Sequence, residues 1–172
     1  MKQLSKLNDF MHRFLPTSQR EAITISLKKK VISDVTWPYI PWPTAVLENE
    51  IKEGDVVIID RKIIDLYPEI AGVVSKNKKL IDIEAHEKQK SYKGLIPIIN
   101  KLIKSGFRKN HRLIGIGGGI TQDITAFTAS IMYRGVNWIF FPTTLLAQGD
   151  SCIGSKTSIN FGEYKNQVGG FY

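Results

Sequence analysis

GIGGGITQD, residues 115–123, holds three consecutive glycines between an apolar run and a helical pattern. The run before it, RLIGI (112–116), is typical of a buried parallel strand. Glycine permits a tight turn and lets a ligand approach the main chain, and the helix that follows offers N–H groups suited to a phosphate. The spacing meets the dinucleotide fingerprint G-x-G-x-x-G only in part. From these residues alone, the segment is either a plain tight turn or a phosphate-binding turn.

Short apolar runs recur on both sides of this segment and alternate with helical patterns. The predicted strands are DVVIID (55–60), KKLIDIE (78–84), RLIGI (112–116) and NWIFFP (137–142). Helices are predicted over 91–107, with Ser91 as its N-cap, and over 120–135. Pro97 falls inside the first helix and predicts a late start or a kink there. Strands that alternate with helices predict an α/β domain with a parallel sheet.

The residues before this alternation give weaker signals. The first 20 residues predict a helix or a loose arm, and EAITISLKKKVISDVTW (21–37) is strand-like. WPYIPWP (37–43) predicts a connecting loop, because its three prolines exclude a regular helix or a central strand.

Composition bounds the class of protein and its partners. The chain has 172 residues, about one domain, and a net charge of +8. The excess charge is either a solvated surface or a site for an anionic partner. We expect a small phosphate ligand and no nucleic acid, because zinc-finger and RNA-binding signatures are absent. We also expect no membrane partner and a cytoplasmic location, because long apolar runs and a signal peptide are absent and there is one cysteine.

Polar and small residues gather after the fourth predicted strand, in FPTTLLAQGDSCIGSKTSINFGEYKNQVGGFY (141–172). Ligands bind open α/β sheets at the carboxyl ends of the strands, where this segment begins. The candidates there are Thr143, Thr144, Asp150, Lys156, Lys165 and Asn166. The lysines could hold phosphate as point charges, although isolated lysines are more often solvated surface.

The pattern GIGGGITQD…YRG…PTTLLAQGDSCIGSKTSIN…YKNQVGGFY resembles the N-terminal half of 3-dehydroquinate synthases and related sugar-phosphate cyclases. The resemblance is close over about residues 112–172 and weaker back to Glu87. It implies a Rossmann-like parallel sheet with flanking helices that binds NAD, and a C-terminal helical domain that is absent from this chain. It implies that residues 1–54 are an N-terminal arm with first strands, and that 55–172 are the NAD-binding domain ending in a substrate-binding loop region.

The resemblance also implies an activity: a carbon–oxygen lyase that acts on phosphate. The substrate would be a phosphorylated keto-sugar acid, 3-deoxy-arabino-heptulosonate 7-phosphate, and the products 3-dehydroquinate and phosphate, on the shikimate pathway to aromatic amino acids. NAD would act as a transient oxidant. A divalent metal, zinc or cobalt, and a homodimer are expected for the full-length protein.

Site residues carry over by position in the motifs. The implied cofactor-binding set is Asp60, Glu87, Lys90, Gly118, Gly119, Asp123, Thr143, Thr144, Lys156 and Lys165. Asp150, Lys156 and Asn166 are the implied catalytic residues, and with Arg134, which would reach the neighbouring subunit, they form the substrate-binding set. Simpler roles stay open: Asp60 as a strand-end aspartate, Asp123 as a first-turn dipole partner, and Arg134 as a helix-end cation.

Several positions depart from the family pattern. Glycine is common where this chain has Gln122 and Ser155, and the Asp-Gly-Glu step reads Ala85-His86-Glu87. Lys62 stands where the family has a strand-end asparagine. These departures put the adenosine pocket in doubt, and they leave open a related cyclase that acts on another sugar phosphate.

The family's metal ligands, one Glu and two His, come from a later part of the chain. His12, His86 and His111 show no ligand spacing, so we assign no metal residue. The chain therefore resembles an N-terminal fragment or a truncated reading frame, and its activity alone is doubtful. A polyol dehydrogenase-like enzyme and a non-catalytic NAD-binding module remain as alternatives.

Overall fold

A computed structural model describes residues 44–76, 79–153 and 156–171. The expectations for residues 1–43, namely the arm, the strand-like segment and the proline-rich loop, lie outside the described residues. The predicted division of the chain at residue 54 stays a prediction.

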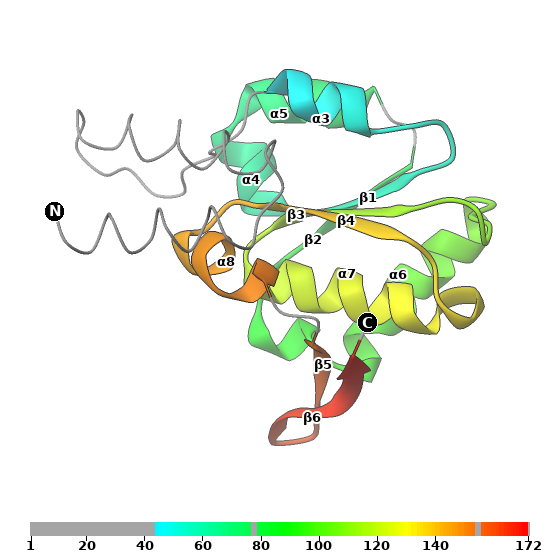
Figure 1. The fold of residues 1–172 in the computed structure, drawn as a ribbon, viewed down its shortest axis with the longest axis vertical. Helices are drawn as coiled ribbons and strands as arrows, with labels where there is room; N and C mark the ends of the chain where they lie inside the picture. The colour runs from blue at the N-terminus through cyan, green and yellow to red at the C-terminus, as the bar shows by residue number, and fades with distance from the viewer. Residues whose placement is uncertain (1–43, 77–78, 154–155, 172) are drawn as a thin grey trace, which may run out of the picture. The chain divides into compact units, whose positions relative to one another are not determined.

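A four-stranded parallel sheet forms the centre of the fold (Figure 1). Its strands are β1 (Val56–Asp60), β2 (Leu80–Ile83), β3 (Leu113–Gly117) and β4 (Trp138–Pro142), in the order β2-β1-β3-β4. Val56 pairs with Leu113 and Leu113 with Trp138, so the two inner strands are in register with their neighbours. All four predicted strands and the α/β class are confirmed. The inner strands are buried on both faces, which explains their continuous apolar runs.

Helices cover both faces of the sheet (Figure 1). One face carries α3 (Thr44–Glu50), α4 (Arg61–Leu66) and α5 (Pro68–Ser75). The other carries α6 (Tyr92–Lys104) and α7 (Gly119–Ile131). Two single turns, η1 (Glu87–Gln89) and η2 (Met132–Arg134), precede α6 and follow α7.

Helix α6 begins where its sequence signal predicts. The Ser91 hydroxyl accepts a hydrogen bond from the Gly94 N–H at 3.3 Å, as an N-cap does. The helix starts at Tyr92 and runs through Pro97, so of the two predicted alternatives the late start is wrong and the kink stays a prediction. Leu95, Ile98 and Leu102 bury one face of the helix, and their packing offsets the hydrogen bond lost at the proline.

Two glycines of β3 let α7 pack closely against the sheet. A Cβ at Gly115 would lie 2.8 Å from Thr125 Oγ1, and a Cβ at Gly117 would overlap the Thr121 side chain. Both threonines are fully buried on α7. The glycines of this strand therefore set the helix–sheet distance in addition to forming the turn that follows.

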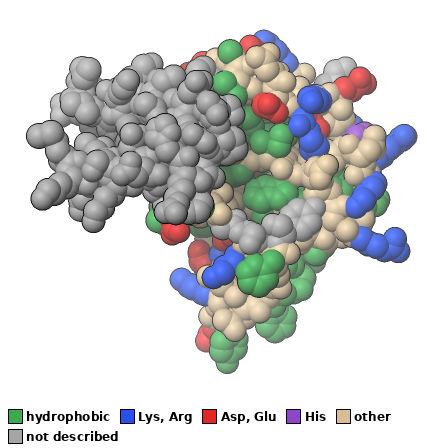
Figure 2. Space-filling view, in the orientation of Figure 1, with side chains coloured by type: hydrophobic (Ala, Val, Ile, Leu, Met, Phe, Trp, Pro, Cys, Tyr) green, Lys and Arg blue, Asp and Glu red, His purple; other side chains and the backbone are tan. Residues whose placement is uncertain are grey.

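A short helix and a hairpin follow β4. The connection contains α8 (Leu145–Gly149) and the turn η3 (Ser151–Ile153), and the hairpin is β5 (Lys156–Phe161) paired with β6 (Tyr164–Phe171). Ile159 of β5 joins the core that α6 and α7 share with the sheet. Phe161, Tyr164 and Phe171 are exposed, and Figure 2 shows apolar side chains projecting from the hairpin at the bottom of the view. Sequence analysis did not predict this hairpin.

Among the described helices, none combines the length and the apolar character that a membrane crossing requires.

An ion pair at the amino ends of the strands joins the residues that directly precede β1 and β3. Asp55 is 2% exposed, and its carboxylate accepts hydrogen bonds from Arg112 Nη2 at 2.6 Å and from the Lys52 N–H at 2.9 Å. Arg112 Nη2 also donates to the Glu50 carbonyl at 2.6 Å. The hydrogen bond to the Asp55 carboxylate raises the pKa of Arg112, so the guanidinium stays charged.

We expect Asp55→Ala to lower the free energy of unfolding by about 3 kcal/mol, because it leaves a partly buried guanidinium without its carboxylate. Urea denaturation at 25 °C would measure the change. The exposed Asp65→Ala is the matched control and should cost less than about 0.5 kcal/mol. Equal effects of the two substitutions would contradict a structural role for the pair.

Candidate functional site

The predicted site residues converge at the carboxyl ends of the parallel strands. Asp60 ends β1, and Glu87 and Lys90 lie just beyond β2. The glycine turn ends β3, and Thr143 follows β4. Because parallel strands end at one edge, the sheet brings together residues that are far apart in the sequence.

The glycine turn is the N-terminus of α7. Gly118 is the N-cap and Gly119 the first helical residue, and no described side chain caps the helix. Thr143 N–H donates to the Gly117 carbonyl at 2.8 Å, which fixes the end of β4 against the turn. The first N–H groups of a thirteen-residue helix therefore point out of the sheet edge without a side-chain acceptor, as an anion site requires.

Two buried hydroxyls flank this turn. Thr121 and Thr143 are fully buried, and their Oγ1 atoms have no hydrogen-bond partner among the described residues. A buried hydroxyl without a partner costs free energy. Thr121 Oγ1 faces Gly117 inside the contact between α7 and β3, so its lost hydrogen bond is a cost of that close packing.

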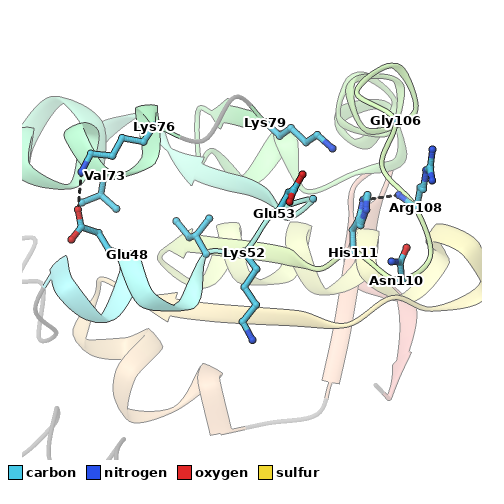
Figure 3. Close-up of a pocket in the computed structure, with 12 residues that line it drawn as sticks. Glu48, Lys52, Glu53, Val73, Lys76, Lys79, Gly106, Arg108, Asn110 and His111 are labelled. Atoms are coloured by element: carbon cyan, nitrogen blue, oxygen red, sulfur yellow. Dashed lines mark hydrogen bonds and ion pairs between the residues drawn. The ribbon is translucent and has the colours of Figure 1, made fainter.

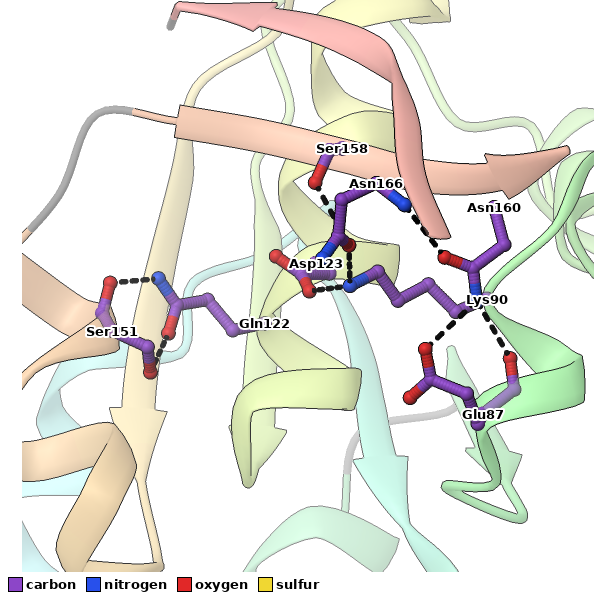
Figure 4. A network of polar contacts seen from close by, with 8 residues as sticks. All are labelled: Glu87, Lys90, Gln122, Asp123, Ser151, Ser158, Asn160 and Asn166. Carbon is purple, nitrogen blue, oxygen red and sulfur yellow. Dashed lines mark hydrogen bonds and ion pairs between the residues drawn. The ribbon is translucent and has the colours of Figure 1, made fainter. Parts of the chain in front are cut away.

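A buried ion pair lies beside the first turns of α7 (Figure 4). Lys90 is 5% exposed, and its Nζ lies 2.5 Å from Asp123 Oδ2. Burial raises the pKa of Asp123 above its ordinary value, and the hydrogen bond from Lys90 opposes that rise. Lys90 therefore supplies the interaction that favours the ionised form of Asp123.

The same lysine ties the hairpin to the sheet edge. Lys90 Nζ also donates to Asn166 Oδ1, which further accepts from Ser158 Oγ at 3.2 Å. Asn160 Oδ1 accepts a hydrogen bond from the Asn166 N–H at 2.9 Å, and Asn160 Nδ2 donates to Glu87 Oε1 at 2.8 Å. Four residues predicted for the site, Glu87, Lys90, Asp123 and Asn166, thus lie in one network (Figure 4).

Asn166 holds its place in that network with an uncommon backbone conformation. Its φ is +56°, in the left-handed region that asparagine tolerates better than most residues. This conformation points its N–H at Asn160 while its side chain accepts from Lys90.

Other predicted residues border the network at more distant points. Asp60 Oδ1 accepts from the Lys62 N–H at 3.1 Å and caps α4. Thr144 caps α8 by accepting from the Ala147 N–H at 3.2 Å, and Asp150 ends that helix. Lys156 and Lys165 lie on β5 and β6 with exposed side chains.

Arg134 stands apart from the other predicted site residues. It is exposed in η2, after α7 has crossed the sheet to the amino ends of the strands. Within one chain it does not join the network, so the predicted role across a subunit boundary stays a prediction.

Sequence reasoning missed four members of the site. Asn160 and Ser158 lie on a strand, and Gln122 and Ser151 bond to each other beside the glycine turn. Asn160 and Ser158 gave no usable signal, because the strand that holds them was itself not predicted. Gln122 stood out only as a departure from a family glycine, and nothing in the sequence pointed to its distant partner Ser151.

Two cavities adjoin the predicted residues. One, of about 580 Å³, is lined by Arg61, Asp82, Glu84 and Glu87, and the other, of about 530 Å³, by Glu87, Asn160 and Lys165. Arg61 donates to Asp82 at 2.5 Å and lowers the pKa of that carboxyl.

A larger cavity, of about 930 Å³, lies at the opposite edge of the sheet (Figure 3). Its lining comes from segments that precede β1, β2 and β3, such as Glu53, Lys79 and His111. The Glu48–Lys76 ion pair, at 2.9 Å, borders one end. No residue predicted for the site lines this cavity.

No group of three or more His, Cys, Asp or Glu in the described ranges is placed to hold a metal ion.

Comparisons with known proteins agree with this architecture. The family model described as 3-dehydroquinate synthase N-terminal matches residues 80–172. The 3-dehydroquinate synthase of Dictyoglomus thermophilum is 44% identical over 108 residues, which cover 63% of this chain and 30% of that protein. The enzyme of Pelagibacter ubique is 48% identical over 88 residues, 51% of this chain and 24% of that protein. This chain thus spans about a third or less of these relatives.

A solved structure shows the same fold. The 2-epi-5-epi-valiolone synthase of Streptomyces hygroscopicus subsp. jinggangensis, with NAD⁺ and Zn²⁺ bound, superposes with a TM-score of 0.65 and 26% identity, covering 82% of this chain and 42% of that one. The parallel sheet, the glycine turn and the match over more than half of the sequence lead to one conclusion: the chain belongs to the 3-dehydroquinate synthase family.

Proposed function

We propose that this chain is the NAD-binding half of a 3-dehydroquinate synthase, a lyase that converts 3-deoxy-arabino-heptulosonate 7-phosphate to 3-dehydroquinate and phosphate. The observation that carries the proposal is the uncapped N-terminus of α7, which lies beside the buried Lys90–Asp123 pair. A pyrophosphate suits the first feature, and a polar, charged substrate suits the second.

The residues present fit NAD. A Cβ at Gly118 would lie 3.0 Å from Thr144 Cγ2, so a methyl group there would crowd the Thr144 side chain beside the turn. Gly118 and Gly119 would hold the pyrophosphate through the main chain. Asp60 and Glu87 would accept hydrogen bonds from ribose hydroxyls, and the polar residues Asp123, Thr143 and Thr144 would border the nicotinamide end.

When bound, NAD would supply a transient oxidation of the substrate, which acidifies a neighbouring C–H bond and permits loss of phosphate. The chain's own residues would orient the substrate. Lys156 and Asn166 would bind its oxygens, Asp150 would hold a hydroxyl, and Lys90 would keep Asp123 ionised beside them. Lys165 would add positive charge for the anionic ligands.

We also propose that the full-length protein binds a divalent metal ion and forms a homodimer. As the family resemblance implies, zinc or cobalt would bind to ligands of a C-terminal helical domain. In the dimer, Arg134 would reach a phosphate bound to the partner subunit. The product would enter aromatic amino acid biosynthesis in the cytoplasm.

A second candidate is a related sugar-phosphate cyclase with another substrate. It is favoured by the similarity to the valiolone synthase structure and by Lys62 and Ala85, which depart from the family pattern. An activity assay with the C-terminal half supplied would separate these candidates, because it would show which phosphorylated substrate is consumed.

We expect the full chain to bind NAD in isothermal calorimetry, and Gly118→Asp to abolish that binding. The substitution places a carboxylate against the pyrophosphate and crowds Thr144. Gly118→Ala tests the crowding alone and should weaken binding less.

Gly72→Asp is the matched control for the added charge, because a Cβ at Gly72 meets nothing within 4 Å. It should bind NAD like the parent chain. Binding by Gly118→Asp at parental affinity would exclude the glycine turn as the cofactor site.

We expect Lys90→Met to raise the pKa of Asp123 further, because it removes the interaction that opposes desolvation. A carboxyl group whose pKa is higher in the folded state contributes its full stabilisation at pH values below its unfolded-state pKa. That stabilisation is lost as the pH rises through its folded-state pKa. The variant should therefore lose more stability than the parent as the pH rises above about 4.

Carbon-13 NMR titration of the Asp123 carboxyl would measure the shift, and urea denaturation across pH would measure the stability. Lys93→Met, an exposed lysine on α6, is the control and should leave the titration midpoint in place. An unmoved midpoint in Lys90→Met would show that the pair does not control Asp123.

A further inference from the structure

Gln122 and Ser151 form a reciprocal pair of hydrogen bonds beside the glycine turn (Figure 4). Gln122 Nε2 donates to the Ser151 carbonyl at 2.6 Å, and Ser151 Oγ donates to Gln122 Oε1 at 2.7 Å. Gln122 is 4% exposed, and its own N–H donates to the Gly118 carbonyl in the first turn of α7. The side chain thus connects the start of this helix to η3.

Few apolar side chains of the segment that receives this contact are buried. Between Leu145 and Ile153, only Ala147 is buried, and Leu145, Leu146 and Ile153 expose their side chains. Burial of apolar side chains therefore contributes little to the position of the segment. The segment contacts the turn and α7 near its two ends: Thr144 lies against Gly118, and Ser151 bonds to Gln122.

The pairing uses both functions of the amide. Glutamine offers a donor and an acceptor on one planar group, which matches the carbonyl and the hydroxyl of a single serine. Ser151 directly follows Asp150, the residue that would hold a substrate hydroxyl. The Ser151 hydroxyl also lies 3.8 Å from where a Cβ on Gly119 would be, so the paired segment reaches the edge of the turn.

We propose that Gln122 is a positioning residue that fixes Asp150 relative to the pyrophosphate-binding turn. By holding Ser151, it sets the distance between the Gly118–Gly119 main chain and the Asp150 carboxylate. The nicotinamide end of the cofactor would lie between these two points. The inference rests on the proposed function, because it assigns the pair to the same cofactor site.

A double-substitution cycle in the full chain tests the proposal, with NADH as the probe. We expect Gln122→Ala to weaken NADH binding about tenfold, because the segment beside the nicotinamide end is then no longer held in place before the ligand binds. Ser151→Ala removes one of them and should cost less. The double variant should bind no more weakly than Gln122→Ala, because the two residues act through one contact. The fluorescence increase of bound NADH, which reports a held nicotinamide, should fall in Gln122→Ala.

The pH dependence of NADH binding by Gln122→Glu is a further test, because a merely structural role of Gln122 would not produce it. Ionised glutamate accepts from the Ser151 hydroxyl but repels its carbonyl, whereas protonated glutamate restores both hydrogen bonds. NADH affinity of this variant, relative to Gln122→Ala at the same pH, should therefore rise as the pH falls. Asn100→Ala, an exposed amide on α6, is the control and should match the parent chain.

The outcomes separate the two claims. A parent chain that binds neither NAD nor NADH overturns the proposed function, and with it the positioning role. A parent that binds NADH, while Gln122→Ala binds equally well with the same fluorescence, overturns the positioning role alone. Strictly multiplicative losses in the cycle would also overturn it, since the residues would then act independently.

Discussion

The close approach of α7 to β3 is the constraint on which the rest of the structure depends. It requires strand positions without side chains, since a Cβ at Gly115 or Gly117 would run into a buried threonine of the helix. The same approach aims the helix N-terminus out of the sheet edge beside Thr143, and it brings Asp123 within reach of Lys90. One packing distance therefore sets the core, the turn and the charged centre of the site together.

The charged centre and the hairpin stabilise each other. Lys90 is buried because β5 and β6 cover it, and its charge is tolerable there because Asp123 and Asn166 accept its hydrogen bonds. In return, the hairpin gains a polar anchor at Asn166 of β6, a strand that is exposed except at Val168, which packs against the core. Under the proposed function, a ligand bound at this edge would contact the same lysine that holds the hairpin, so ligand binding and the position of the hairpin would be coupled.

The strands, α6, α7 and the glycine turn could be predicted because each has a local signal: continuous apolar runs, the Ser91 cap, and glycine between two patterns. Asn166 was a candidate because it follows the fourth predicted strand, whereas Glu87, Lys90 and Asp123 came from a resemblance. The structure brings these four residues into one network. What could not be predicted depends on distant contacts. Asn160 matters through Glu87, and Gln122 through Ser151. The hairpin was missed because β6 is exposed along most of its length and so lacks the alternation that marks a half-buried strand.

The strand order has a consequence for how the chain reaches this fold. β1 lies between β2, which follows it closely, and β3, which comes much later in the sequence. During synthesis, one edge of β1 can pair early, while the other waits on the order of seconds for Leu113 and its neighbours to emerge. The apolar segment Val56–Asp60 then presents unpaired backbone to other nascent chains. Non-local parallel pairing of this kind slows folding, so this strand stays open to aggregation until β3 has been made and paired.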